Sequence, residues 1–410
     1  MPQTMSDRQQ ILKRILDETG GHRPHYERYS LLAVPATIEA LFGLSPTGPS
    51  LKAELGLPSS EVVMSVIVDG LGYHSLEALR EKGVVDLGPF LVGGHYLPLT
   101  SVFPSTTTAA LSSLSTGLSP IGHGVLGYKL FWSEVGSVVD MIRLTTPGGR
   151  DNALEKLGIP PERVLTASTV YQRLAAAGVA TTLFLPKYLV DSGLSRALYQ
   201  GVERTVPYLT SSDLLMHIAH AGRGPKPALL SVYWPSTDSL GHVYGPTTQA
   251  FELEVAHVFR ILGQACAMLP RGTTVLVTAD HGFYEADPVA DMVSCPTHPA
   301  LRDGLLLPPV GDPRASYLFV RRGHEEEVQA FFSRSFPNEF AVLSVEEALA
   351  RKLWGLDEPT PAVRALLGDL LVLSQKRKFL LWPTEEFKLR GLHGALTPGE
   401  LYVPLLANVV

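Results

Sequence analysis

The stretch VVMSVIVDG, residues 62–70, decides the fold of this chain. Its first seven residues are nearly all apolar, and the run stops abruptly at Asp69 and Gly70. A run of this kind predicts a strand that is buried on both faces, as the strands of parallel sheets are. Two further runs, residues 228–234 and 274–278, follow the same pattern, and an amphipathic helical stretch over residues 248–268 lies between them. This alternation predicts an α/β fold with a central, mostly parallel sheet sandwiched by helices.

The composition argues against several classes of protein. The 410 residues include 34 Lys and Arg against 40 Asp and Glu, for a formal net charge of −6. We therefore expect no polymeric nucleic acid as a partner, because such binding rests on a basic surface. Charges interrupt the first 30 residues, unlike a signal peptide, and no stretch approaches the roughly 18 apolar residues of a membrane span. Two widely separated cysteines, Cys266 and Cys295, are typical of a reducing compartment. These features predict a cytoplasmic protein that does not enter a membrane; they leave the oligomeric state open.

Changes of composition and of predicted secondary structure along the chain indicate three regions. Residues 1–60 precede the first strand and are predicted to form a helical extension packed on the core. Residues 61–300 together with 376–410 are predicted to form the α/β core. Proline-rich sequence then leads into a strand at 316–320 and helices at 325–333 and 345–352, the last opened by the capping box Ser344–Glu347. We interpret residues 301–375 as a smaller inserted α+β cap.

Acidic residues and histidines follow the predicted strands. Open α/β sheets bind ligands beyond the carboxyl ends of their strands, so these side chains are expected to share one site. Asp238 and His242 are four residues apart, which places them on one face of a helical turn. Three aspartates with three histidines suit a divalent metal such as zinc or manganese. The candidate ligands are Asp69, Asp238, His242, Asp280, His281 and His393.

A run of hydroxyl residues lies where an extended segment meets a predicted helix. The sequence FPSTTTAALSSLSTG, residues 103–117, predicts a helix that begins near Thr107. Ordinary helix capping accounts for one hydroxyl but not for the whole run. A hydroxyl beside a divalent ion ionises more easily than in water, so this run is a candidate source of a nucleophile.

The ordered motifs VDG, FPSTTTAALSSLSTG, GHG, TDSLGH, TADHG and LHG resemble those of the alkaline phosphatase superfamily, and most closely its type I phosphodiesterase and nucleotide pyrophosphatase branch. They run from residue 69 to residue 394 in the family's order. The sulfatase branch needs a Cys or Ser in a Cys-x-Pro-Ser-Arg motif. Neither cysteine of this chain lies near such a motif, which argues against a sulfatase. The resemblance implies an alkaline phosphatase-like fold and two metal ions, zinc first and manganese as the alternative. One ion would bind Asp69, Asp280, His281 and the nucleophile; the other would bind Asp238, His242 and His393.

The resemblance also implies the catalytic residues. The family's nucleophile lies nine positions before the Thr of a Thr-Gly pair, here Thr116-Gly117, which selects Thr107 and leaves Thr106 and Thr108 as alternative registers. Where the nucleotide pyrophosphatases carry an Asn that donates to the phosphoryl oxygen, this chain has Tyr128. Either the Tyr128 hydroxyl or Lys129 is the candidate replacement.

The expected activity is hydrolysis of a small phosphorylated substrate. We expect a phosphodiester or nucleotide pyrophosphate to be cleaved through a phospho-threonine intermediate on the two-metal site. Hydrolysis of a phosphonate or a phosphate monoester is the runner-up. A phosphomutase and a non-catalytic relative remain as further alternatives, although the latter would be expected to lack the nucleophile or several ligands.

Overall fold

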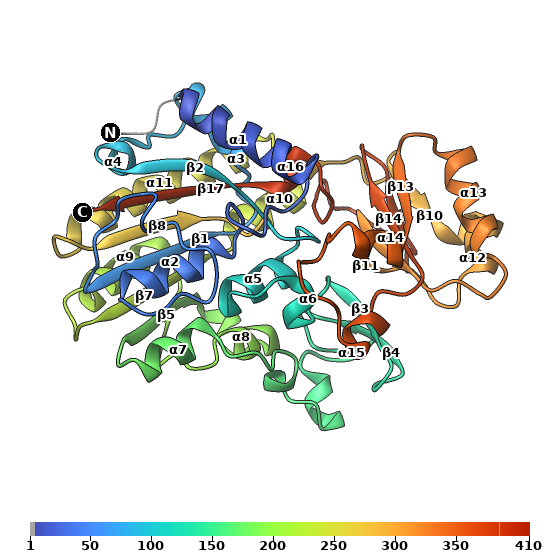
Figure 1. Cartoon of the computed structure of the whole chain (residues 1–410), viewed down its shortest axis with the longest axis horizontal. Coiled ribbons are helices and arrows are strands. Elements are labelled where there is room, and N and C mark those ends of the chain that lie inside the picture. The colour runs from blue at the N-terminus through green and yellow to red at the C-terminus, as the bar shows by residue number, and fades with distance from the viewer. Residues whose placement is uncertain (1–4, 385) are drawn as a thin grey trace.

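The apolar run at residues 62–68 forms β1, a central strand of a seven-stranded sheet (Figure 1). The computed structural model describes residues 5–384 and 386–410. The strand order is β2-β17-β8-β1-β7-β5-β6. The strands are β1 (Val62–Val68), β2 (His95–Thr100), β5 (Ala180–Pro186), β6 (Arg204–Tyr208), β7 (Ala228–Trp234), β8 (Thr274–Thr278) and β17 (Tyr402–Val409). β1 pairs in parallel with β7 on one side and β8 on the other, while β17 runs antiparallel to its neighbours β2 and β8. The predicted mostly parallel sheet is confirmed.

Two groups of helices cover opposite faces of the sheet (Figure 1). One group comprises α2 (Ala33–Leu41), α5 (Thr107–Thr116), α7 (Val170–Ala176) and α8 (Gly193–Leu198). The other comprises α4 (Gly88–Leu91), α9 (Ser211–Ala221), α10 (Ser236–Tyr244) and α11 (Gln249–Met268). The seven-stranded sheet and its helices form the first lobe. Its other α-helices are α1 (Met5–Thr19), α3 (Tyr73–Glu81), α6 (Pro120–His123) and α16 (Pro398–Leu401). Because both faces are covered, every residue of β1, β7 and β8 is buried, which explains why these strands read as continuous apolar runs.

A second lobe is built on a six-stranded antiparallel sheet with the order β13-β14-β12-β11-β3-β4. Its strands are β3 (Lys129–Trp132), β4 (Ser137–Asp140), β11 (Val310–Asp312), β12 (Ala315–Leu318), β13 (Phe340–Ser344) and β14 (Leu370–Ser374). Its helices are α12 (Pro299–Gly304), α13 (Glu325–Ser335), α14 (Val345–Ala350) and α15 (Pro361–Ala365). The predicted capping box is present, with Ser344 capping α14 and Glu347 returning the bond.

The boundaries of this lobe differ from the predicted insertion at residues 301–375. β3 and β4 come from residues 129–140, inside the range assigned to the core, and join the second sheet at the bridge Gly311↔Lys129. β10 (Met292–Ser294) precedes the predicted range and β15 (Phe379–Leu381) follows it, and these two strands pair with each other. A further short pair, β9 (Tyr284–Glu285) with β16 (Gly391–Leu392), lies beside the core. Strands of two to four residues carry too little periodicity to be assigned from sequence.

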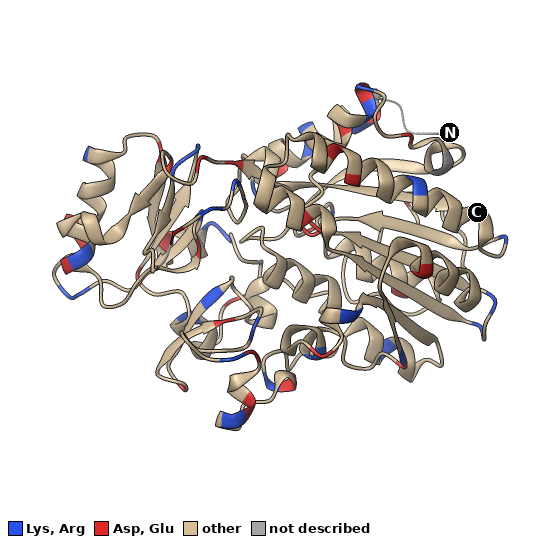
Figure 2. Cartoon of the chain, turned by 180° about the vertical axis from the view of Figure 1, so that it is seen from behind, with Lys and Arg blue, Asp and Glu red and all other residues tan. Residues whose placement is uncertain are grey.

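Charged residues of both signs are interspersed over the two lobes (Figure 2). Within the described ranges, no helix is both long enough and apolar enough to cross a bilayer.

Candidate metal centre

The candidate ligands converge where the three central strands end. Asp69 directly follows β1, Asp280 and His281 follow β8, and Asp238 and His242 lie on α10, which begins just after β7. Since β8, β1 and β7 are adjacent and parallel, their carboxyl ends meet at one edge of the sheet. Thr107, the first residue of α5, and His393, in the loop after β16, complete the site. The structure therefore brings together all seven metal-site residues named from the sequence.

The glycine of the first motif is required by close packing. Gly70 has φ +73°, and a Cβ atom there would lie 2.5 Å from the ring of Phe283. Its N–H donates to Asp280 Oδ1 at 3.1 Å. The turn after β1 is thus tied to the end of β8, and Asp69 is held facing the site.

One group of ligands surrounds Nε2 of His281. The hydroxyl oxygen of Thr107 lies 3.0 Å from this nitrogen. Oδ1 of Asp69 and Oδ2 of Asp280 each lie 3.5 Å from it. His281, Asp69 and Asp280 are all buried, whereas Thr107 is half-buried. The nucleophile candidate thus faces the protected end of the site.

A second group is more open to solvent. Nε2 of His242 lies 3.3 Å from Asp238 Oδ1 and 3.3 Å from Nε2 of His393. Ligand atoms of Asp238, His242 and His393 all lie within 4.8 Å of one another, and so do those of Asp69, Asp238 and His281. Asp238 therefore stands between the two groups.

All three histidines are oriented in the same way. Nδ1 of His242 bonds the carbonyl oxygen of Gly391 at 2.8 Å, and Nδ1 of His393 bonds that of Ser105 at 3.1 Å. Nδ1 of His281 bonds the carbonyl of Gly282 at 3.0 Å. A carbonyl only accepts, so each Nδ1 carries the proton and each Nε2 presents a lone pair. This is the arrangement of a metal-ligating histidine.

Each of the three carboxylates has one oxygen without a compensating donor. Asp69 Oδ1, Asp238 Oδ1 and Asp280 Oδ2 are buried oxygens without a hydrogen-bond partner. Burial raises the pKa of Asp69 well above its ordinary value, and the nearby Asp280 carboxylate raises it further. Burial also raises the pKa of Asp238. Burial and the two neighbouring imidazoles lower the pKa of His393 well below its ordinary value. Unpaired carboxylate oxygens beside Nε2 atoms of histidines fit divalent cations.

Tyr128 is placed differently from what its predicted role requires. Its hydroxyl donates to Asp140 Oδ2 at 2.8 Å. Burial, and then the Asp140 carboxylate, raise the pKa of the Tyr128 hydroxyl. The alternative donor, Lys129, is exposed on β3 with its Nζ 5.4 Å from the centre of the Tyr128 ring. A donor role for Tyr128 toward a phosphoryl oxygen stays a prediction, and it requires the bond to Asp140 to break.

Several residues that the sequence did not indicate support the ligands. The hydroxyl of Tyr233 donates to Asp69 Oδ2, and that of Thr237 donates to the Asp69 carbonyl. The ring of Phe283 packs edge-on against His242 and His281. Tyr233 belongs to the β7 run and Thr237 precedes Asp238, so proximity to the TDSLGH motif is the one sequence signal that pointed to them.

His123, in the GHG motif, is a structural residue. Its Nδ1 accepts the N–H of Val125 at 3.1 Å, so Nε2 carries the proton and donates to Ser113 Oγ at 2.9 Å. Burial lowers the pKa of His123 from 6.5 to about 3. The neutral ring thus ties α6 to α5, the helix that begins at Thr107.

We expect this histidine to make the protein sensitive to acid. Its folded-state pKa lies below its unfolded value, so below pH 6.5 the unfolded chain binds a proton that the folded one does not. The neutral His123 therefore does not weaken the fold above pH 6.5. As the pH falls to roughly 5, the free energy of unfolding should decrease by about 2 kcal/mol. Urea unfolding of wild type and His123→Gln at about pH 7.5 and pH 5 checks this. The variant should lose less stability on acidification, whereas equal losses would contradict the assignment.

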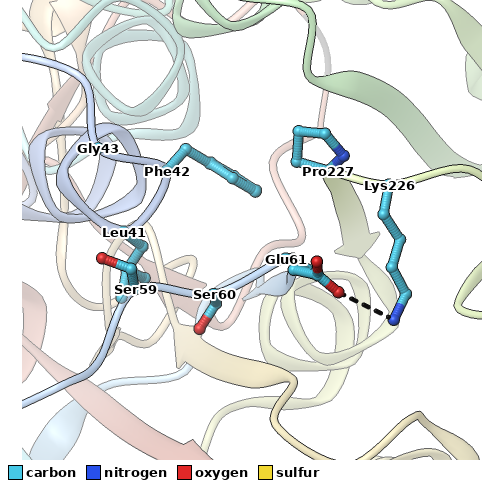
Figure 3. A pocket seen from close by; sticks show the side chains of 8 residues that line it. All are labelled: Leu41, Phe42, Gly43, Ser59, Ser60, Glu61, Lys226 and Pro227. Carbon is cyan, nitrogen blue, oxygen red and sulfur yellow. Dashed lines mark hydrogen bonds and ion pairs between the residues drawn. The ribbon is translucent and has the colours of Figure 1, made fainter.

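A hollow at the opposite end of the sheet offers no comparable chemistry. It has a volume of about 380 Å³ and lies at the amino ends of β1 and β7 (Figure 3). Its lining residues include Glu61 and Lys226, whose Oε2 and Nζ lie 3.4 Å apart. Two oppositely charged side chains already paired with each other do not form a catalytic constellation, so the candidate site is at the carboxyl ends of the strands.

A mostly parallel sheet that carries carboxylates, histidines and a threonine at its carboxyl edge defines the alkaline phosphatase-like class of metal-dependent enzymes. Within this class, the chain belongs to the type I phosphodiesterase / nucleotide pyrophosphatase family, whose family model matches residues 63–304. Members of this family hydrolyse phosphoric esters.

The relatives are distant in sequence, and solved structures among them share the fold. Venom phosphodiesterase 2 of Crotalus adamanteus is 23% identical over 203 residues, 47% of this chain and 23% of that protein. The chain therefore spans about a quarter of the length of the curated relatives it matches. An inactive form of murine ectonucleotide pyrophosphatase / phosphodiesterase 5 in complex with AMP superposes with a TM-score of 0.65 at 18% identity, covering 85% of this chain and 88% of that one. Phosphonoacetate hydrolase from Sinorhizobium meliloti 1021, in complex with phosphonoacetate, gives 0.62 at 21% identity, covering 86% and 91%.

Proposed function

We propose that this chain hydrolyses small phosphodiesters or nucleotide pyrophosphates in a metal-dependent reaction that passes through a phosphorylated Thr107. The observation that carries the proposal is the position of the Thr107 hydroxyl, 3.0 Å from His281 Nε2 and next to unpaired oxygens of Asp69 and Asp280. A half-buried hydroxyl among candidate metal ligands is an activated nucleophile in this kind of chemistry.

We propose two divalent ions, zinc first and manganese as the alternative. Asp69, Asp280, His281 and Thr107 would hold one, and Asp238, His242 and His393 the other. When bound, such ions lower the pKa of a hydroxyl or water and neutralise the charge of the transferred phosphoryl group.

The chain's own residues then have distinct tasks. Thr107 Oγ1 gives its proton to solvent and forms the bond to phosphorus, while the ester oxygen on the far side departs with the bonding electrons and takes up a proton from water. The phosphoryl group on Thr107 keeps the second ester group of a diester substrate. Water subsequently cleaves the phospho-threonine and restores the hydroxyl. The carbonyl oxygens of Gly282, Gly391 and Ser105 keep each imidazole Nε2 directed into the site. Positioning of this kind accounts for much of the catalysis of phosphoryl transfer.

Phosphonate hydrolysis is the second candidate, and a specific observation favours it. The family's amide donor is replaced by Tyr128, whose hydroxyl is committed to Asp140. A site without that donor has less reason to prefer a nucleotide diester. The fold is also shared with a phosphonoacetate hydrolase.

A substrate panel separates these candidates. Chromogenic phosphate diesters, phosphate monoesters and phosphonates are assayed with zinc, with manganese, and after chelation and dialysis. We expect diester turnover to exceed the other two by about tenfold or more, equivalent to about 1.4 kcal/mol of transition-state stabilisation. The chelated protein should be inactive and should melt at a lower temperature, because its unpaired carboxylates then repel one another.

Other results of the same panel are equally informative. A dominant phosphonate activity would select the second candidate. Full turnover after exhaustive chelation would refute the metal mechanism. The control variant is Lys226→Ala, which removes an ion-paired lysine at the far end of the sheet. Its turnover and its melting temperature should equal those of the wild type.

A further inference from the structure

Asp312, a residue of the second lobe, reaches the turn that precedes Thr107. It ends β11 and is 4% exposed. Its Oδ1 accepts the hydroxyl proton of Thr106 at 2.8 Å, and its Oδ2 accepts the N–H of Tyr128 at 3.3 Å. Burial raises the pKa of Asp312 to about 6, which leaves the carboxyl ionised, and able to accept both bonds, at neutral pH. One carboxylate therefore joins the second sheet to the residue next to the nucleophile.

The bond changes what Thr106 does. Thr106 is the N-cap residue of α5, with φ −138° and ψ 148°. A threonine in this position usually accepts an N–H of the first helical turn. Thr106 makes no such side-chain capping bond, because its hydroxyl points to Asp312 instead. The Thr106 side chain, next to Thr107, is therefore bonded to the second lobe and not to its own helix.

The backbone closes tightly around this carboxyl. A Cβ atom at Gly127 would lie 3.2 Å from Asp312 Oδ2, and one at Gly394 would lie 2.9 Å from Asp312 Cβ. The carbonyl of Gly394 also accepts the N–H of Ser105 at 3.2 Å. Asp312 thus stands where the nucleophile turn, the segment after GHG and the loop that carries the candidate ligand His393 meet.

The geometry distinguishes Asp312 from a metal ligand. Among the described residues, Asp69, Asp238 and Asp280 each have a buried carboxylate oxygen without a hydrogen-bond partner, whereas Asp312 has none. Both of its oxygens already accept hydrogen bonds from protein groups.

We propose that Asp312 is a positioning residue, which holds the Thr106–Thr107 turn so that the Thr107 hydroxyl is aimed at phosphorus. The inference rests on the proposed function and deepens it. It assigns to the second lobe a part in aligning the nucleophile.

The test uses the full-length, metal-loaded protein and the diester of the panel. Asp312→Ala should lower kcat by about 10²-fold, the typical effect of a small misplacement of a reacting group, with little change of KM or of bound metal. Thr106→Val, which keeps the shape and removes the hydroxyl, should lower kcat comparably. The double variant should be no worse than either single one, because both remove the same hydrogen bond. Asp312→Asn should recover part of kcat, since its amide oxygen still accepts from Thr106.

Asp291→Asn is the matched control for the loss of a buried carboxylate. Asp291 accepts hydrogen bonds from Asp287 and Arg377, neither of which belongs to the candidate site. This variant should keep the wild-type kcat, and an equal fall of kcat in Asp291→Asn and Asp312→Ala would overturn the positioning role.

Four further outcomes are decisive. Loss of bound metal in Asp312→Ala would overturn the inference by making Asp312 a ligand. A wild-type kcat in Thr106→Val beside an impaired Asp312→Ala would overturn the coupling through Thr106. If the wild-type chain hydrolyses no phosphoric ester or phosphonate with either metal, the proposed function is refuted. If the wild type is active and Asp312→Ala has the same kcat, the positioning role alone is refuted.

Discussion

Replacing Thr107 with alanine is expected to lower kcat by on the order of 10³-fold or more while bound metal stays close to the wild-type content. The substitution removes the atom that would form the bond to phosphorus. The other candidate ligands around His281 Nε2, Asp69 and Asp280, are unaltered. Steady-state kinetics with the best substrate of the panel, together with elemental analysis of the purified protein, measures both quantities.

The neighbouring threonines provide the controls. The hydroxyl of Thr106 is bonded to Asp312, and Oγ1 of Thr108 is buried without a hydrogen-bond partner. Among the three threonines, Thr107 is the one whose hydroxyl reaches a candidate ligand. Thr108→Ala should therefore retain most activity, and Thr107→Ser, which keeps a hydroxyl, should recover part of it. An inactive Thr108→Ala beside an active Thr107→Ala would move the nucleophile by one residue.

Loss of His393 should trap the reaction halfway. In the proposed assignment His393 belongs to the ion that serves the water step, whereas Asp69 belongs to the ion that serves Thr107. We expect His393→Ala, mixed with substrate and quenched in acid, to accumulate a phosphoryl group on the peptide that contains Thr107, with the second ester group still attached when the substrate is a diester. Asp69→Ala should accumulate none, because the threonine is not activated. Mass spectrometry of the digested protein reads out both variants, and Thr107→Ala gives the background.

The structure sharpens the choice of variants for this experiment. Asp238 has ligand atoms close to those of both groups, so its removal is expected to disturb both halves of the reaction. His393 and Asp69 belong to different groups and make the cleaner pair. Equal trapping in His393→Ala and Asp69→Ala would mean that the ligands are assigned to the wrong ions, even with the site itself correctly located.

Much of the core could be predicted from the chain because its signals are local. The strands predicted at 228–234 and 274–278 have those bounds in the structure, and the helix predicted near Thr107 begins at that residue. Burial on both faces makes a strand apolar throughout, and a polar stop follows where the strand leaves the sheet. The predicted limits of the second lobe, residues 301–375, were wrong. β3 and β4 are short strands that join this lobe from residues 129–140.

The sequence by itself determined the fold class, the family's motifs and the ligand types, since each of these depends on residue identity and spacing within one segment. Only the tertiary structure decided how the candidate ligands are grouped, with Asp238 between two groups, and which hydroxyl of the threonine run faces them. It alone revealed the hydrogen bond between Asp312 and Thr106, which are 206 residues apart along the chain. Hydrogen bonds between segments so far apart leave no periodicity or spacing in the sequence, because they depend on how the two sheets pack together.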